Sequence, residues 1–230
     1  MHQSINKKKI YFYLFIFLFL NKIFNFNLSK KLEEIILINK INIEGISQKE
    51  KKLVKKEVNN FINYNIFFIN KDQFLQKLSK FNFFDNVKVQ KILPSKINIF
   101  FEKTNFLGFS IINGKKFYIG NNGKFTLAEK VEIEKNLPMI YGKFQINDFL
   151  NLQNILKSEK IDIKQITEYY YYNNKRWDLK KNGLIIKLPP KNIKTSLNIY
   201  KKLADKNRLN QTKIIDLRIS NQIIITDEAK

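Results

Sequence analysis

The sequence contains no cysteine and a single histidine, and both absences remove whole classes of chemistry. Without cysteine there can be no disulfide, no thiolate metal site and no cysteine nucleophile. His2 precedes the apolar run near the N-terminus, so we expect no histidine-based triad or metal cluster in the rest of the chain. The seven glycines include no glycine-rich phosphate loop. We therefore expect no cofactor, no metal and no enzymatic activity.

Arginine and alanine are also scarce, and the formal net charge of +22 comes almost entirely from lysine. A charge of this size can indicate a nucleic-acid or anionic-membrane surface. However, Lys, Ile, Asn, Phe and Tyr are abundant together, which is typical of A+T-rich coding. The lysines are also scattered rather than gathered in one arm. We therefore expect no nucleic-acid binding. A complex with nucleic acid whose affinity falls steeply as the salt concentration rises would contradict this expectation.

The N-terminal region predicts a single membrane anchor. Lys7 to Lys9 precede an unbroken apolar run, Ile10 to Leu20, which is shorter than the ~20 residues that a bilayer core of about 30 Å requires. The apolar character resumes as far as Leu28, and a helix over 10–28 would reach about 28 Å if Lys22 extended its amine to the interface. The flank lacks the small residues of a cleavage site, which favours an uncleaved anchor over a cleaved signal peptide. The three N-terminal lysines favour a cytoplasmic N-terminus.

The next segment has the order strand, helix, helix, strand, strand. Alternating residues predict the strands, and a capping-box pattern at Ser47 to Glu50 predicts the start of the first helix. One compact arrangement for this order is a small sheet covered on one face by two helices. The segments are Lys40–Gly45, the helix after Ser47, the helix opened by Asn70–Gln73, Val87–Gln90 and Ile97–Glu102.

The remainder is richer in strands. Asn113-Gly114, Asn121-Asn-Gly123 and Asn182-Gly183 are hairpin signals, because both residues of such a turn can adopt positive φ. The tyrosine run 169–172 predicts a strand with two rings inward and two at the surface. The other expected strands are 106–112, 116–120, 176–180, 184–188, 214–219 and 222–226, with helices at 146–157 and 193–205.

Several motifs, in order behind the N-terminal apolar segment, resemble the FtsQ/DivIB family of bacterial division proteins, and specifically its alphaproteobacterial FtsQ type. The resemblance covers nearly the whole chain. The hairpin at 118–125 has Asn121 or Asn122 where aspartate is common. The motifs are Ile41–Gly45, Asn65–Ile69, Phe84–Val87 with Val89–Lys91 and Pro94–Lys103, Tyr118–Phe125, Leu137–Gly142, Arg176–Leu179 with Gly183 and Leu188-Pro189, and Ile215–Arg218.

The resemblance implies an α+β chain with a single N-terminal transmembrane helix. A POTRA-like β-α-α-β-β domain would follow, and then a mostly antiparallel β domain with flanking helices. The expected segments are a cytoplasmic tail (1–9), an anchor (10–28), a connector (29–38), the POTRA-like domain (39–104) and the C-terminal β domain (105–230).

The resemblance further implies a non-catalytic scaffold at the division septum of the inner membrane, with both domains in the periplasm. The implied partners are the bitopic proteins FtsB and FtsL, and further FtsK and FtsW/FtsI. The alternatives are a membrane-tethered basic nucleic-acid-binding protein and a POTRA-containing assembly or secretion factor. The position after Arg218 is often tyrosine in the family and is isoleucine here. The implied partner-binding residues, which would pair by strand addition, are Asp216, Leu217, Arg218, Ile219, Ser220, Gln222, Ile223, Ile224, Ile225 and Thr226.

Overall fold

The computed structural model describes residues 7–25, 34–133, 136–205, 212–219 and 222–227. The chain divides into two compact units. The first unit comprises residues 1–46, 51–80 and 87–101, and the second comprises residues 47–50, 81–86 and 102–230. Both helices and strands occur in each unit, so the expected α+β class is confirmed.

The N-terminal helix α1 spans Lys7–Asn25. It begins three residues before the predicted anchor and therefore includes the lysine triplet as well as Lys22. Among the described residues, no helix is both long and apolar enough to cross a membrane. Residues 1–6 of the predicted tail, 26–28 of the predicted anchor and 29–33 of the predicted connector lie outside the described residues.

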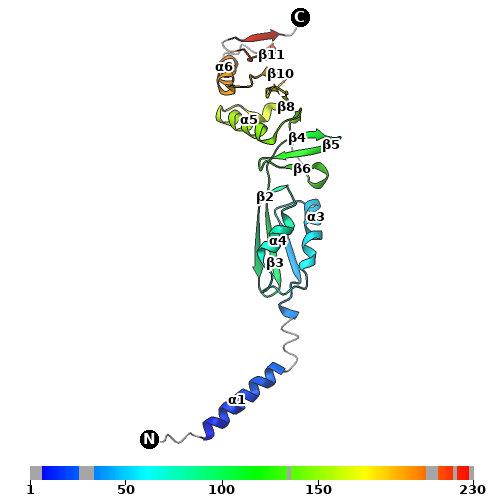
Figure 1. Cartoon of the computed structure of the whole chain (residues 1–230), viewed down its shortest axis with the longest axis vertical. Helices are drawn as coiled ribbons and strands as arrows, with labels where there is room; N and C mark the ends of the chain where they lie inside the picture. Colours follow the sequence, from blue (N-terminus) through cyan, green and yellow to red (C-terminus); the bar gives the residue numbers. More distant parts are fainter. Residues whose placement is uncertain (1–6, 26–33, 134–135, 206–211, 220–221, 228–230) are drawn as a thin grey trace, which may run out of the picture. The chain divides into compact units, whose positions relative to one another are not determined.

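A three-stranded sheet forms the centre of the first unit, in the order β1-β3-β2. β1 runs parallel to β3, so that Ile41 and Ile43 align with Ile97 and Ile99. The two helices cover one face of this sheet (Figure 1), and the buried side chains of Val54, Val58, Phe74, Leu78, Ile97 and Ile99 form its core. The elements are β1 (Lys40–Glu44), α3 (Gln48–Val58), η1 (Asn59–Phe61), α4 (Lys71–Leu78), β2 (Phe84–Ile92) and β3 (Lys96–Lys103).

Both predicted helix starts are capping boxes. The Ser47 N–H donates to the Glu50 carboxylate over 2.8 Å, and the Glu50 N–H donates to Ser47 Oγ over 3.4 Å. At α4, the Asn70 N–H donates to Gln73 Oε1 over 3.0 Å, and Asn70 caps the helix in return. Each box satisfies backbone donors that the first helical turn leaves unpaired, which is why the sequence pattern located these starts.

A nine-stranded sheet forms the second unit, in the order β12-β11-β10-β9-β8-β7-β4-β5-β6. The sheet is mixed, because the pairs β4–β7, β7–β8 and β10–β11 are parallel and the others are antiparallel. The elements are β4 (Phe106–Ile112), β5 (Lys115–Gly120), β6 (Phe125–Leu127), η2 (Ala128–Lys130), β7 (Met139–Tyr141), α5 (Ile146–Ser158), η3 (Ile163–Gln165), β8 (Ile166–Tyr171), β9 (Trp177–Lys181), β10 (Leu184–Lys187), α6 (Ile193–Asp205), β11 (Thr212–Asp216) and β12 (Ile224–Asp227).

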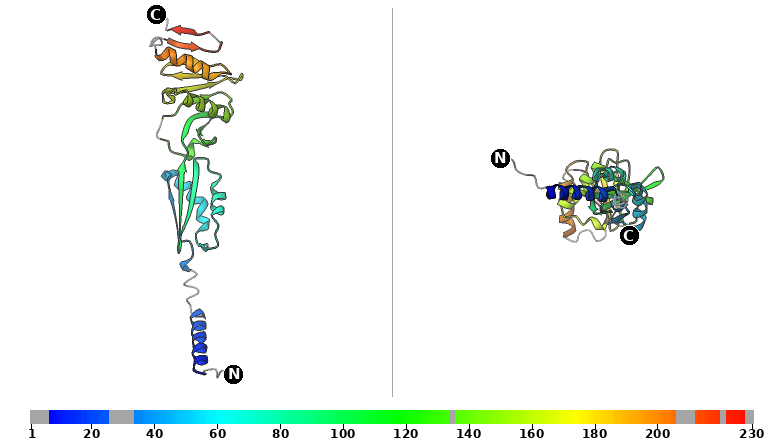
Figure 2. Two further views of the ribbon diagram at one scale, coloured as in Figure 1. Left: turned by 90° about the vertical axis from the view of Figure 1, so that its left-hand side faces the viewer. Right: turned by 90° about the horizontal axis from the view of Figure 1, so that it is seen from below.

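The helices α5 and α6 pack on one face of the nine-stranded sheet (Figure 2). Phe149 and Leu152 of α5 and Leu197 of α6 belong to the same buried cluster as the strand residues Tyr169 and Trp177. Tyr169 is fully buried, and the Tyr171 hydroxyl donates to Asp148 of α5 over 3.0 Å, whereas Tyr172 is exposed. The tyrosine run therefore alternates between the two faces of its strand, as predicted.

Two of the predicted hairpin turns form as expected. Asn113 and Gly114 join β4 to β5 with φ values of 49° and 72°, and Asn182 and Gly183 join β9 to β10 with values of 48° and 84°. The strand bounds differ at the C-terminal end, where β11 ends at Asp216 rather than continuing to Ile219. The Arg218 backbone N–H donates to the Asp216 side chain over 3.1 Å, which bends the chain out of the strand at this point.

Candidate functional site

The strand β12 forms one edge of the nine-stranded sheet. It pairs with β11 in an antiparallel register that places Ile224 opposite Asp216, Ile225 opposite Ile215 and Thr226 opposite Ile214. Its other side faces no strand among the described residues. An edge strand presents a row of backbone N–H and C=O groups that another extended segment can pair with.

The first two residues of β12 and the residue before them have exposed, apolar side chains. Ile223, Ile224 and Ile225 are 41%, 49% and 41% exposed. On the helix-covered face, a row of buried residues crosses the sheet through Leu179, Ile186 and Ile215 and ends at Ile225. The apolar row therefore continues past the last covered position, and an added strand would extend it.

An arginine–aspartate fork lies directly after β11. Arg218 Nε donates to both carboxylate oxygens of Asp216, over 2.8 and 2.9 Å, and a terminal nitrogen of the guanidinium makes a further bond to Oδ2. These bonds hold the pKa of Asp216 below its usual value, and they raise the pKa of Arg218. The fork fixes the chain just before it turns towards β12, because a charged bidentate pair is both strong and directional.

The sheet register places further charged side chains in line with Asp216 on the two neighbouring strands, β10 and β9. Lys187 lies opposite Asp216 on one side and opposite Asp178 on the other. Asp178 is 2% exposed and forms an ion pair with Arg176, at 3.2 Å between Oδ1 and Nε. Burial raises the pKa of Asp178, although the Arg176 charge and a Tyr172 hydrogen bond oppose that effect.

Sequence reasoning missed Asp178 and Lys187 as neighbours of the predicted site. Arg176 and Asp178 alternate as charged residues on a surface strand also do. The Asn182-Gly183 hairpin places Lys187 opposite Asp178, but Lys187 lies opposite Asp216 only because β10 pairs with β11, which follows α6 in the sequence. No local signal marks that pairing.

We expect Asp216→Asn to reduce the loss of stability on acidification. A folded pKa below the unfolded value of about 3.9 contributes stability that is complete above that value and is lost as the pH falls through the folded pKa. Urea unfolding between about pH 2 and pH 7 checks this. Trp177 is the reporter, because it is the only tryptophan and is 3% exposed in the second unit.

The control for this experiment is Asp178→Asn. The pKa of Asp178 is raised, so its ionisation opposes folding as the pH rises, and the acid-side loss should persist in that variant. If the free energy of unfolding falls equally steeply at acidic pH in Asp216→Asn and in the unmodified chain, the arginine–aspartate fork does not have the stabilising role given to it.

The structure separates the predicted partner-binding residues into two groups. Leu217 is 3% exposed and belongs to the core of the second unit, so its side chain faces inward. Arg218 and Ile219 are exposed, and the Gln222 N–H donates to the Ile219 carbonyl over 3.2 Å just before β12. Ser220 lies outside the described residues. Ile219 and Gln222 also border a cavity of about 220 Å³ beside α6.

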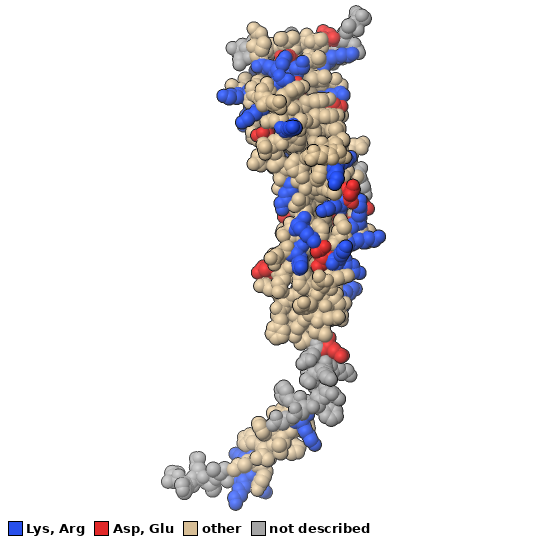
Figure 3. Space-filling model, turned by 45° about the vertical axis from the view of Figure 1, so that its right-hand side comes forward, with Lys and Arg blue, Asp and Glu red and all other residues tan. Residues whose placement is uncertain are grey.

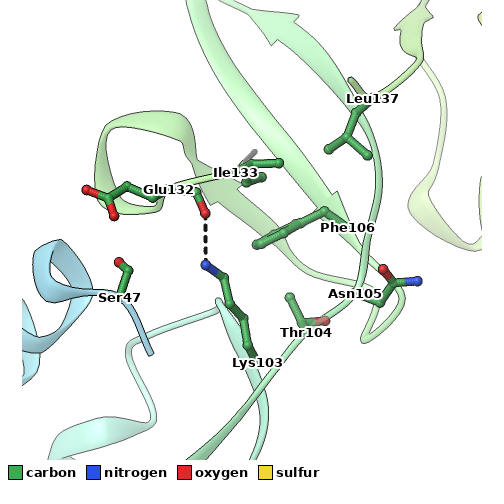
Figure 4. A pocket seen from close by; sticks show the side chains of 8 residues that line it. All are labelled: Ser47, Lys103, Thr104, Asn105, Phe106, Glu132, Ile133 and Leu137. Carbon is green, nitrogen blue, oxygen red and sulfur yellow. Dashed lines mark hydrogen bonds between the residues drawn. The ribbon is translucent and has the colours of Figure 1, made fainter. Parts of the chain in front are cut away.

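A larger cavity, of about 310 Å³, lies elsewhere in the second unit beside Lys103 (Figure 4). Lys103 Nζ donates to the Glu132 carbonyl over 2.9 Å and pairs with the fully buried Glu50 carboxylate at 2.7 Å. Its ammonium group is therefore already engaged inside the fold. Within the described ranges, no group of acidic or histidine side chains is arranged to hold a metal ion.

Comparisons with known proteins match the second unit above all. Residues 111–218 match the family model for the C-terminal region of the cell division protein FtsQ/DivIB. The cell division protein FtsQ of Rickettsia bellii is 29% identical over 198 residues, covering 85% of this chain and 72% of that protein. The cell division protein DivIB of Clostridium botulinum (strain Loch Maree) is 29% identical over 103 residues, which is 45% of this chain and 40% of that protein.

One solved structure is also similar. It is the major extracytoplasmic domain of the cell division protein DivIB from Geobacillus stearothermophilus, with 12% identity, a TM-score of 0.31, and coverage of 47% of this chain and 98% of that domain.

The family model and the named relatives are all described as cell-division proteins. Residues 111–218 resemble the C-terminal region of the FtsQ/DivIB family, and the two relatives named above carry the same family names, so the resemblance found in the sequence is confirmed. The matched region of the family model ends at Arg218. It includes β11 and the arginine–aspartate fork but not β12, so the case for β12 rests on its geometry.

Proposed function

We propose that this chain is a non-catalytic, membrane-anchored scaffold of the division machinery. Its domains in the periplasm would link early and late division proteins at the septum, and β12 would pair with an extended segment of a bitopic partner of the FtsB or FtsL type. Contacts with FtsK and FtsW/FtsI belong to the same proposal. The first unit would be the POTRA-like domain and the second the C-terminal β domain.

The observation that carries the proposal is the exposed edge of β12. Ile223, Ile224 and Ile225 are each more than 40% exposed. An exposed apolar edge strand can pair with unrelated chains and aggregate, so a protein rarely leaves one uncovered. A partner strand would satisfy the outward backbone groups and cover Ile225, the end of the buried row.

Charge distribution does not favour the nucleic-acid alternative. On the face seen in Figure 3, Lys and Arg are spread over both units with Asp and Glu among them. Two arginines on this side of the sheet are already paired, since Arg218 binds Asp216 and Arg176 pairs with Asp178. Affinity for a phosphate backbone instead requires several unpaired cations that act together.

Hydrogen exchange tests the partner site directly. The full chain is compared with and without the FtsB-type partner of the same organism, and the amides of 222–227 should become protected on binding. Protection confined to other strands, with 222–227 exchanging as in the free chain, would place the partner elsewhere.

A reporter fusion tests the proposed anchor. We expect a reporter that is active only in the periplasm to be active when it is fused after Lys230, because Lys7 to Lys9 favour retention of the N-terminus in the cytoplasm. A matched fusion to a reporter active only in the cytoplasm should be silent. The reverse result would exclude the proposed topology.

A further inference from the structure

One end of the first unit carries a set of exposed apolar side chains, here called the apolar cap. The three segments that form it are joined by backbone hydrogen bonds. The Ile66 N–H donates to the Ile36 carbonyl over 3.0 Å, and the Asn39 N–H donates to the Ser95 carbonyl over 3.0 Å. The cap residues and their exposed fractions are Ile35 (48%), Tyr64 (59%), Phe67 (57%), Phe68 (87%), Ile92 (37%) and Leu93 (59%).

The loop before α4 holds two phenylalanines outward. Ile66 and Ile69 are buried, with exposures of 0% and 4%, and they fix the loop on both sides. The Phe67 N–H donates to Asn65 Oδ1 over 2.9 Å, and the Phe68 N–H donates to the Asn65 carbonyl over 3.2 Å. The fold thus uses the flanking isoleucines for packing and leaves both rings in water. Side chains of this size are rarely left exposed together on a surface that contacts nothing.

Two lysines lie at the base of the cap. Lys40 and Lys96 are directly opposite each other in the β1–β3 register, and both are exposed. Like charges placed opposite each other on a sheet repel, so an anion near them would be favourable. The six cap residues are uncharged, and their chain neighbours include Glu34 before Ile35 and Lys91 before Ile92. Apolar and aromatic side chains at a tip with cations behind them match the layers of a phospholipid surface, where acyl chains lie below anionic headgroups.

The covalent chain keeps the cap close to α1. Ile35 follows Asn25 by ten residues, so the two positions are at most about 36 Å apart. Side chains of α1 such as Tyr11 and Phe12 are 71% and 61% exposed, and they also require an apolar environment. If α1 is held in a membrane, the cap is within reach of that membrane's surface.

We propose that the apolar cap docks onto the surface of the phospholipid bilayer that holds α1, with Phe67 and Phe68 inserted at the headgroup–acyl boundary and Lys40 and Lys96 beside the phosphates. This inference rests on the proposed membrane anchor. Docking would fix the first unit against the membrane and leave β12, in the second unit, as a surface for partners.

Tryptophan scanning of the full chain in vesicles tests the proposal. Phe68→Trp and Tyr64→Trp each place a reporter in the cap, and both replace an exposed aromatic ring, so folding should be unaffected. Ile111→Trp is the matched control, since Ile111 is an exposed residue (53%) of the second unit. The vesicles contain phosphatidylethanolamine and phosphatidylglycerol, with and without brominated acyl chains, and the signal of buried Trp177 is subtracted using the unmodified chain.

We expect brominated lipid to quench both cap reporters, with emission shifted to shorter wavelength, and to leave the control unchanged. Lys40→Gln with Lys96→Gln should reduce quenching in these vesicles but not in pure phosphatidylcholine. Vesicle flotation separates the two proposals. A chain that does not float overturns both the anchor and the docking. A chain that floats with cap reporters quenched no more than the control overturns the docking alone. A blue shift without quenching also overturns it, because a protein surface then covers the cap.

Discussion

Proline at the outward-facing position of β12 is expected to weaken capture of the partner's strand by roughly 30-fold or more, which corresponds to about 2 kcal/mol. Backbone N–H groups alternate between the two sides of a strand, so one of Ile224 and Ile225 donates towards β11 and the other donates away from it. Ile224→Pro and Ile225→Pro are therefore compared. Hydrogen exchange in the free chain identifies the outward amide as the one that is less protected.

The proline that removes the outward N–H should weaken binding by that factor while the second unit stays folded, as followed by Trp177 fluorescence. The other proline should also lower the stability of the second unit, because it breaks the β11–β12 ladder. Ile225→Lys tests the apolar row, and Ile111→Lys is its control at another exposed isoleucine of the second unit. Full-strength binding by both proline variants in a folded chain would show that the partner does not pair with β12.

Gly142→Ala is expected to destabilise the second unit by about 4 kcal/mol, a large effect for one methyl group. Gly142 has a φ of +99°, and a Cβ at this position would lie 2.2 Å from the Tyr171 carbonyl oxygen. Both the backbone conformation and the contact therefore oppose a side chain. The clash is with backbone at the end of the β7–β8 pair, so it cannot be relieved by a change of rotamer.

Gly183→Ala is the matched control. Gly183 has a similar φ of +84°, but a Cβ there would meet nothing within 4 Å. It should cost only the backbone strain, about 1 kcal/mol. Urea unfolding followed by Trp177 fluorescence measures both variants. Equal effects would mean that conformational strain alone, and not the contact with Tyr171, requires glycine at position 142.

Local signals in the sequence located most elements of the fold. The asparagine–glycine turns at 113–114 and 182–183 fixed two hairpins, because their residues adopt positive φ without help from the rest of the chain. The capping box at Ser47 acts within one turn of helix. In these places, the residues that determine the structure are adjacent, so the pattern alone was sufficient.

The order of the strands in the sheet could not be predicted from such local signals. The parallel pairs that join β7 to β4 and β8, and β10 to β11, bring together strands separated by long segments. These three pairs make the sheet mixed, although its other pairs are antiparallel, as expected for a mostly antiparallel domain. Two of the parallel pairs have helical crossovers, because α5 connects β7 to β8 and α6 connects β10 to β11, and both helices bury their apolar sides in a single core.

The predicted partner-binding segment also combines features that neighbouring residues determine with features that only the tertiary structure determines. The run of three isoleucines at its end indicated a strand, and the sequence motifs indicated a resemblance to the family, because both are properties of neighbouring residues. Only the tertiary structure decided that Leu217 is buried, that Asp216 belongs to a charged row with Lys187 and Asp178, and that Ile225 is the uncovered end of a buried row. Burial and register depend on which distant strands lie alongside, and that is determined by the packing of the whole sheet.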